Sequence, residues 1–169
     1  MPRVKNRRLS LERASLYRIC KTFEIESGHF LSKHKEKCKN PHGHTRKIEI
    51  IIRSSGLDEN DMVFDFKAFK LAFGEFIDQF DHAMIVNTAS PDFEFYKKHY
   101  ERVIGTDNVD PTTEVLAKLM FDFINKELSK GKSYKSSQGY EYRFPKGIIL
   151  ERVRVWETPS TWAEFSLEQ

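Results

Sequence analysis

The stretch CKNPHGHTRKIEI, residues 38–50, decides how the rest of the chain is interpreted. It places one of only two cysteines close to two histidines, His42 and His44, which are separated by a single glycine. The isoleucines at every second position from Ile48 to Ile52 predict a strand over residues 45–54. Side chains two positions apart on an extended backbone point the same way, so the two imidazoles should lie side by side.

A third histidine follows the strand that the sequence predicts upstream. Residues 16–28 alternate between apolar and polar side chains, and His29 closes this segment. Antiparallel pairing of the two strands would bring His29 beside the start of the strand that carries His42 and His44. Three neutral histidines leave one position of a zinc ion open, which is typical of catalytic zinc sites. The alternative is a loop with solvated histidines.

The two cysteines are given different interpretations. Cys38 lies four residues before His42 and is either a fourth zinc ligand, which would close the site, or a free nucleophile or base beside the metal. Cys20 lies within the first predicted strand, where we expect a small core residue.

Two amphipathic helices are predicted in the middle of the chain. Phenylalanines recur at helical spacing over residues 66–80, with Asp65 as a plausible N-cap. Gly74 inside this pattern suggests a close contact between helix and sheet. The segment DPTTEVLAKLMFDFINKEL predicts the second helix, with Asp110 as N-cap and Pro111 in the first turn.

The remaining segments complete an α+β domain. Residues 88–110 are loop-like, with a short helix in FEFYKKHYERV, and residues 129–146 predict a flexible loop or an exposed hairpin. Strands are predicted over residues 147–157 and in TWAEFSL. The order is β-β-α-α-β-β, which gives an antiparallel sheet with two helices packed on one face.

Four further residues could take part in chemistry. Asp81 and His82 follow the first helix and form either an oriented base or an ordinary polar pair at a helix end. Glu157 ends an apolar strand and either receives paired N–H donors of a ligand or is an exposed strand end. Glu114 is a helix-dipole partner or a ligand contact. No role is assigned to His34 and His99.

Composition limits the classes of function. The formal net charge of +3 is mild and gives no reason to expect a nucleic-acid partner. No apolar run approaches the roughly 20 residues of a membrane span, and two cysteines favour reduced thiols and a cytoplasmic location. Residues 1–15 are interpreted as a flexible basic arm. Residues 16–169 form a single domain with insertions near 88–110 and 129–146.

The motifs together resemble one family, the 6-pyruvoyltetrahydropterin synthase/6-carboxytetrahydropterin synthase family of tunnelling-fold (T-fold) enzymes. The matching pieces, in family order, are His29, C-x3-H-G-H at 38–44, MVFDF at 62–66, DH at 81–82, PTTEVLA at 111–117 and VWET at 155–158. One departure is Thr45-Arg46, where an asparagine or serine followed by an aromatic residue is common in the family.

The resemblance implies roles for nine residues and an assembly. It implies Zn²⁺ held by His29, His42 and His44. It implies Cys38 as the catalytic proton carrier, assisted by Asp81 and His82. Glu157 would anchor the pterin ring, with Thr113 and Glu114 nearby. The resemblance also implies a homohexamer, in which two trimeric β-barrels stack and the active sites lie between subunits.

The branch within the family is indicated by the three-residue gap between Cys38 and His42, which resembles the carboxy-forming enzymes of queuosine (7-deazaguanine) biosynthesis. The implied reaction converts 7,8-dihydroneopterin triphosphate to 6-carboxytetrahydropterin, acetaldehyde and triphosphate. The first alternative is formation of 6-pyruvoyltetrahydropterin, by triphosphate elimination alone. The second, from another class, is a non-enzymatic zinc-stabilised binding protein.

Overall fold

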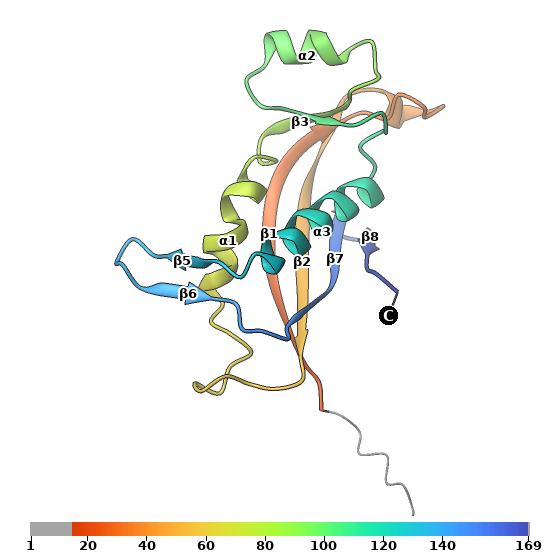
Figure 1. Cartoon of the computed structure of the whole chain (residues 1–169). Coiled ribbons are helices and arrows are strands. Elements are labelled where there is room, and N and C mark those ends of the chain that lie inside the picture. The colour runs from red at the N-terminus through yellow and green to blue at the C-terminus, as the bar shows by residue number, and fades with distance from the viewer. Residues whose placement is uncertain (1–14, 169) are drawn as a thin grey trace, which may run out of the picture.

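Two long strands, β1 (Tyr17–His29) and β2 (His42–Ser54), form the centre of the structure, a computed structural model that describes residues 15–168 (Figure 1). They pair antiparallel over their whole length, with Phe23 opposite Ile48 and His29 opposite His42. The predicted pairing of the first two strands is therefore confirmed. The predicted basic arm, apart from Ser15, lies outside the described residues.

The central pair belongs to a six-stranded sheet with the order β4-β3-β1-β2-β7-β8. On one side, β7 (Ile149–Thr158) and β8 (Thr161–Phe165) continue the antiparallel pairing, as predicted. On the other side, β3 (Ala83–Asn87) and β4 (Val103–Thr106) run parallel to β1.

The prediction of a wholly antiparallel sheet was thus wrong, because the sheet is mixed. Helix α1 (Lys67–Asp78) returns the chain from β2 to the end of β1, where β3 continues in the direction of β1. The short helix α2 (Phe93–His99), which the sequence predicts, connects β3 to β4 in the same way, whereas β3 and β4 themselves were not predicted.

Helices α1 and α3 (Thr113–Ser129) cover one face of the sheet and enclose the core (Figure 1). The fully buried apolar side chains from sheet and helices include Ile48, Ile50, Val153, Val155, Phe69, Phe73, Leu116 and Met120. Each such side chain contributes roughly 1.5–3 kcal/mol to folding. The helices also touch each other, since the rings of Phe76 and Phe123 stack at 3.6 Å. Phe66, which shares the phenylalanine spacing, is half exposed because α1 begins after it.

The two predicted helix caps have different outcomes. The N-cap of α1 is Phe66 rather than Asp65, but the Asp65 carboxylate just before it accepts a hydrogen bond from the backbone N–H of Lys67 at 2.8 Å. Asp110 does not cap α3. The N-cap is Thr112, whose hydroxyl accepts from the N–H of Val115, and Pro111 precedes the helix.

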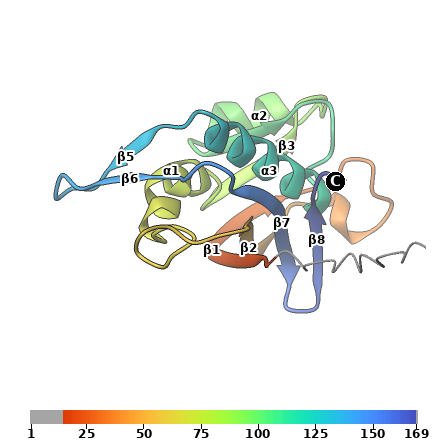
Figure 2. The ribbon, with the colours of Figure 1, turned by 60° about the horizontal axis from the view of Figure 1, so that its bottom comes forward.

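Residues 129–146 form the exposed hairpin that was one of the two predicted alternatives. Strands β5 (Ser133–Lys135) and β6 (Glu141–Arg143) pair antiparallel and extend away from the main sheet (Figure 2). The hairpin is tied to α3 by the buried carboxylate of Glu127. This carboxylate accepts hydrogen bonds from Lys130, from Lys132 at 2.8 Å and from the Tyr134 hydroxyl at 3.0 Å.

Replacing Glu127 with glutamine is expected to destabilise the protein by about 1–3 kcal/mol at neutral pH. Burial alone would raise the pKa of this carboxyl, but the hydrogen bonds from Lys130, Lys132 and Tyr134 outweigh it and lower the pKa from 4.5 to about 2. A depressed folded-state pKa stabilises the protein above the unfolded pKa, so the contribution should fade as the pH drops from about 4.5 to about 2.

Denaturant unfolding at several pH values measures this difference. The matched control is Glu141→Gln in the same hairpin, because Glu141 forms an exposed pair with Lys135 at 3.4 Å. A stability gap between wild type and Glu127→Gln that stays constant down to pH 2 would contradict the assignment.

Within residues 15–168, no helix covers the face of the sheet opposite α1 and α3. Cys20 lies there and is exposed, so its prediction as a core residue was wrong. The error follows from a sheet that is covered on one face only, where every second side chain of β1 points away from the core. Among residues 15–168, no helix is long and apolar enough to cross a membrane.

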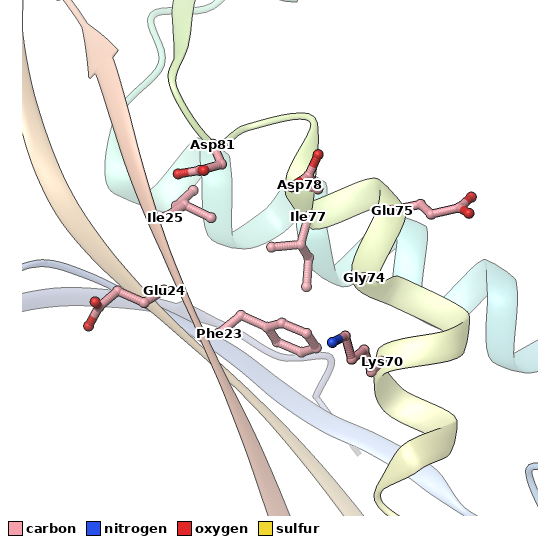
Figure 3. A pocket seen from close by; sticks show the side chains of 9 residues that line it. All are labelled: Phe23, Glu24, Ile25, Lys70, Gly74, Glu75, Ile77, Asp78 and Asp81. Carbon is pink, nitrogen blue, oxygen red and sulfur yellow. The ribbon is translucent and has the colours of Figure 1, made fainter. Parts of the chain in front are cut away.

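A hollow separates β1 from α1 on the helix side (Figure 3). Phe23, Ile25 and Ile77 line it with apolar surface, and Asp81 lies at one end. Gly74 also faces this hollow, and an added Cβ would come no closer than 3.5 Å to Lys70. The predicted close contact at Gly74 is therefore absent.

Candidate metal centre and ligand site

Three histidines come together where β1 ends and β2 begins. His29 and His42 are direct partners in the strand register, and His44 follows on the same face of β2. The ring centroids are 4.5–5.2 Å apart. One ligand-type nitrogen from each ring lies within 4.8 Å of the other two. The predicted convergence of the three histidines is confirmed, and the alternative of separate loop histidines is wrong.

The hydrogen bonds of two histidines fix which ring nitrogen is free. His29 Nδ1 lies 2.8 Å from the carbonyl oxygen of Pro111, and His42 Nδ1 lies 2.8 Å from the carbonyl oxygen of Asn40. Because carbonyl oxygens only accept, each Nδ1 must carry the proton, which leaves the lone pair on Nε2.

The free nitrogens face one another in an arrangement that suits a cation. His29 Nε2 and His42 Nε2 are only 3.1 Å apart, although neither can donate to the other in this tautomer. His44 Nε2 is buried and has no hydrogen-bond partner among the residues that the structure describes. Carbonyl groups that orient ligating imidazoles are typical of metal sites. The three histidines could therefore hold a metal ion.

The surroundings of the cluster favour the neutral form of two of its imidazoles, those of His29 and His44. Burial lowers the pKa of His29 to about 4, and the nearby positive charge of Arg46 acts in the same direction. Burial also lowers the pKa of His44, again with Arg46 contributing. Neutral imidazole is the form that binds metal, so no proton has to be displaced at neutral pH.

Cys38 lies close to the cluster in sequence but is not part of it. The residue sits in a short 3-10 turn (Lys37–Lys39), half-buried. Among the residues that the structure describes, the ligand-type atoms within 4.8 Å of one another come from the three histidines alone. This geometry favours the second of the two predicted interpretations, a thiol outside the ligand set.

The segment that carries Cys38 is held in place by Asp110. The carbonyl oxygen of Cys38 accepts from the N–H of Leu31 at 2.8 Å. The Asp110 carboxylate accepts from the Ser32 hydroxyl at 2.6 Å, from the Lys33 N–H at 2.8 Å and from Asn87 at 2.9 Å. Asp110, predicted as a helix cap, therefore instead fastens the loop between β1 and β2 to the end of β3.

Asp81 and His82 form the contact that the sequence left open. Asp81 Oδ2 lies 2.9 Å from His82 Nδ1, and Asp81 Oδ1 accepts from the Glu26 N–H at 2.8 Å. These hydrogen bonds, that from Glu26 foremost, lower the pKa of Asp81. His82 has a φ of 55°, an uncommon conformation for a non-glycine residue. His82 lines a hollow together with His44, whereas Asp81 lines the hollow between β1 and α1.

The three predicted ligand-binding residues share a second hollow. Thr113, Glu114 and Glu157 line it, and its wall includes Trp162 from β8. Glu157 Oε1 also lies 3.6 Å from His29 Nε2 and 3.7 Å from His44 Nε2. The candidate anchor for a ligand is therefore directly beside the candidate metal centre.

Arg46 and Trp162 were not predicted as site residues. Arg46 is completely buried, and its guanidinium lies among His29, Thr113 and Glu157. The alternation of β2 contained the signal, because position 46 follows His42 and His44 on the same face of the strand. Trp162 gave no such signal, since its place beside Glu157 depends on the hairpin of β7 and β8.

Comparison with known proteins agrees with this geometry. The family model described as 6-pyruvoyl tetrahydropterin synthase matches residues 18–168. The chain is 30% identical to the 6-carboxy-5,6,7,8-tetrahydropterin synthase of Aquifex aeolicus over 90% of this chain and 99% of the relative. It is 28% identical to the Helicobacter pylori (strain J99) protein with the same name, over 90% of this chain and 71% of that protein.

Solved structures show the same fold. An uncharacterized protein from Wolinella succinogenes has a TM-score of 0.72 at 21% identity and covers 91% of this chain and 99% of its own. The 6-pyruvoyl tetrahydropterin synthase of Caenorhabditis elegans has a TM-score of 0.60 at 20% identity, with 92% and 99% covered. Both are similar in the tunnelling fold that the sequence motifs predict. The chain belongs to the 6-pyruvoyl tetrahydropterin synthase family.

Proposed function

We propose that this protein is a zinc-dependent 6-carboxy-5,6,7,8-tetrahydropterin synthase that acts on 7,8-dihydroneopterin triphosphate. The observation that carries the proposal is the convergence of three histidine side chains beside the Glu157 carboxylate. The name of the Aquifex aeolicus relative supports the carboxy-forming reaction, as does the short spacing between Cys38 and His42.

The chain's own residues would divide the work as follows. His29, His42 and His44 would hold Zn²⁺, which when bound supplies a Lewis acid for the oxygens of the substrate side chain. Glu157 would accept N–H donors from the pterin ring, with Thr113 and Glu114 beside it.

Proton transfer is assigned to two groups. Asp81 holds the His82 imidazole in one tautomer and orientation, so that the other ring nitrogen is available to move protons at the substrate side chain. Cys38 would act as the second proton carrier. Proton movement between carbon and oxygen prepares the loss of triphosphate. Cleavage of a carbon–carbon bond then consumes one water molecule, whose oxygen enters the new carboxyl group, and releases acetaldehyde.

Product identification tests the proposal. Purified protein loaded with zinc is incubated with 7,8-dihydroneopterin triphosphate, and the products are separated and identified by mass spectrometry. We expect 6-carboxytetrahydropterin together with acetaldehyde. The name of the matching family favours 6-pyruvoyltetrahydropterin as the second candidate product, which would form without acetaldehyde. No turnover at all would favour a non-enzymatic binding protein.

The proposal also includes an oligomeric state, a cellular location and a pathway. The sheet ends in edge strands β4 and β8, whose unpaired backbone groups could pair with another chain. We expect a homohexamer formed from two trimers, which light scattering of the purified protein would measure. Both Cys20 and Cys38 are free thiols, in keeping with a cytoplasmic enzyme of queuosine biosynthesis.

Replacing Glu157 with glutamine is expected to weaken pterin binding by about tenfold to 150-fold. Burial raises the pKa of this carboxyl, but the charge of Arg46 and a hydrogen bond with Thr113 reverse the effect, so the net pKa is lowered and Glu157 is anionic. An amide keeps the size of the side chain but can accept at one end only. Zinc content should stay unchanged.

Titration with a pterin that lacks a side chain, followed by fluorescence, isolates the contact to the ring. Glu164→Gln is a suitable control, because Glu164 forms ion pairs with Arg152 and Arg154 outside the hollow. Wild-type affinity in Glu157→Gln would mean that Glu157 is only a strand end.

A further inference from the structure

Arg46 is a fully buried charged side chain at the boundary between the two parts of the site. Its exposed fraction is 0%, and its guanidinium reaches three elements at once. Nη1 donates to the Thr113 hydroxyl at 3.1 Å, at the start of α3. Nη2 donates to Glu157 Oε1 at 3.3 Å, near the end of β7. The same Nη2 lies 3.1 Å from His29 Nε2, at the end of β1.

Protein stability alone does not account for an arginine at this position. Burying an arginine is expensive, and an apolar side chain of similar volume is often neutral or stabilising at such a position. The compensation here is incomplete, since the Nε of Arg46 has no hydrogen-bond partner within residues 15–168. On both sides along β2, the same strand face is occupied by site or core residues, namely His44 and Ile48. The partners of Arg46, rather than the packing, therefore indicate its role.

The contacts that Arg46, His29 and His44 make with Glu157 all involve the same oxygen. Arg46, His29 and His44 lie 3.3, 3.6 and 3.7 Å from Oε1, so Oε2 is not engaged by them. These contacts at Oε1 restrict the orientation of the carboxylate, and Glu157 lines the hollow in which a ligand would bind. An arginine fork is suited to this task, because it holds Thr113 and Glu157 with separate nitrogens of one planar group.

Metal binding would sharpen this arrangement. His29 Nε2 has a single lone pair, which can serve either a metal ion or Arg46 but not both. Once that lone pair is taken by a metal, the donors of Arg46 remain directed to Glu157 and Thr113. Through Arg46, binding of a metal ion to the three histidines would therefore affect how firmly Glu157 is oriented.

We propose that Arg46 is a positioning residue that fixes Glu157 and Thr113 for recognition of the pterin ring. The inference rests on the proposed function, because it assigns the hollow beside Glu157 to a pterin. Arg46 acts through Glu157, so its contribution should disappear when Glu157 can no longer act as the anchor.

A double-mutant cycle tests this coupling. Arg46→Met, Glu157→Gln and the double variant are titrated with side-chain-free pterin, and zinc content and unfolding temperature are measured on each. Arg46→Met should weaken pterin binding by about tenfold to 100-fold in the wild-type background, by the loss of a charge-assisted contact. In the Glu157→Gln background the same change should alter the affinity by less than about threefold. Zinc content should not fall.

Two further variants separate positioning from simple loss of structure. Arg53→Met removes a second arginine of β2, which is partly buried and whose Nε likewise lacks a partner in the described part of the chain, and should leave the affinity unchanged. Arg46→Lys keeps the charge but not the fork, and should show a loss of about threefold or more that again vanishes beside Glu157→Gln. If Arg46→Met does not fold, the comparison of Arg46→Lys in the two backgrounds tests whether Arg46 acts through Glu157.

The outcomes are distinct for the two proposals. If wild-type protein fails to bind pterin, the proposed function fails and the inference fails with it. If wild type binds pterin but folded Arg46→Met or Arg46→Lys binds equally well, only the inference is overturned. Equal losses in both backgrounds would also overturn it, because Arg46 would then act independently of Glu157.

Discussion

Replacing His42 with alanine is expected to give a folded protein that retains almost no zinc. Removing a residue that only hydrogen-bonds to a metal ligand typically weakens metal binding by about 10–100-fold. Removing one of the three ligands themselves should weaken metal binding by more than this. The fold should survive, because His42 is only half-buried and lies at the end of a strand whose core contacts begin further along. His44→Ala should behave alike. Metal analysis after dialysis against a mild chelator measures the loss.

Thermal unfolding gives a second measurement that does not depend on activity. A ligand present at 100 times its dissociation constant stabilises the native state by about 2.7 kcal/mol. Zinc should therefore raise the unfolding temperature of wild type but not that of His42→Ala. His34→Ala is the matched control, since His34 is exposed and lies outside the cluster. Full zinc occupancy in both cluster variants would contradict the assignment of the metal centre.

The parts of the fold that local patterns describe were predicted well. Alternation alone located β1 and β2, and once they pair antiparallel, His29 must meet His42. The phenylalanine spacing located α1 because those rings are needed to cover one face of the sheet. The most informative local pattern was H-x-H on an extended backbone, which placed His44 in the same cluster.

The parts that were missed depend on distant partners. β3 is almost wholly buried, and its run of five residues has no alternation that would mark it as a strand. Asp110 resembles a helix cap in sequence, yet its hydrogen bonds come from Ser32, Lys33 and Asn87, far away along the chain. The outward direction of Cys20 likewise depends on which face of the sheet the helices cover.

The candidate site shows the same division. The residue types and spacings indicated three metal ligands and an acidic anchor, but no spacing could show that Glu157 lies beside His29 and His44. That contact requires β7 to pair with β2 in the observed register, with Trp156 opposite Lys47. This register also places the buried Arg46 between Glu157 and His29, a position that the sequence alone does not reveal.

Replacing Cys38 with alanine is expected to preserve zinc binding while reducing turnover by about 100-fold or more. The thiol lies outside the ligand set of the histidine cluster, so its removal should not change the metal content. General acid–base groups typically contribute 10²–10⁴-fold to the rate, and the loss should appear in kcat more than in pterin affinity. Cys20→Ala is the matched control, because Cys20 is an exposed thiol on the open face of the sheet.

Cobalt substitution distinguishes this role from that of a fourth ligand. A thiolate bound to Co²⁺ gives an intense sulfur-to-metal charge-transfer band, whereas three histidines and a water ligand do not. We expect the resting cobalt protein to lack this band and to give the same spectrum as its Cys38→Ala variant. A strong band in wild type that is absent from Cys38→Ala, together with loss of metal from that variant, would identify a closed structural site. The open coordination position that the proposed reaction requires would then not exist.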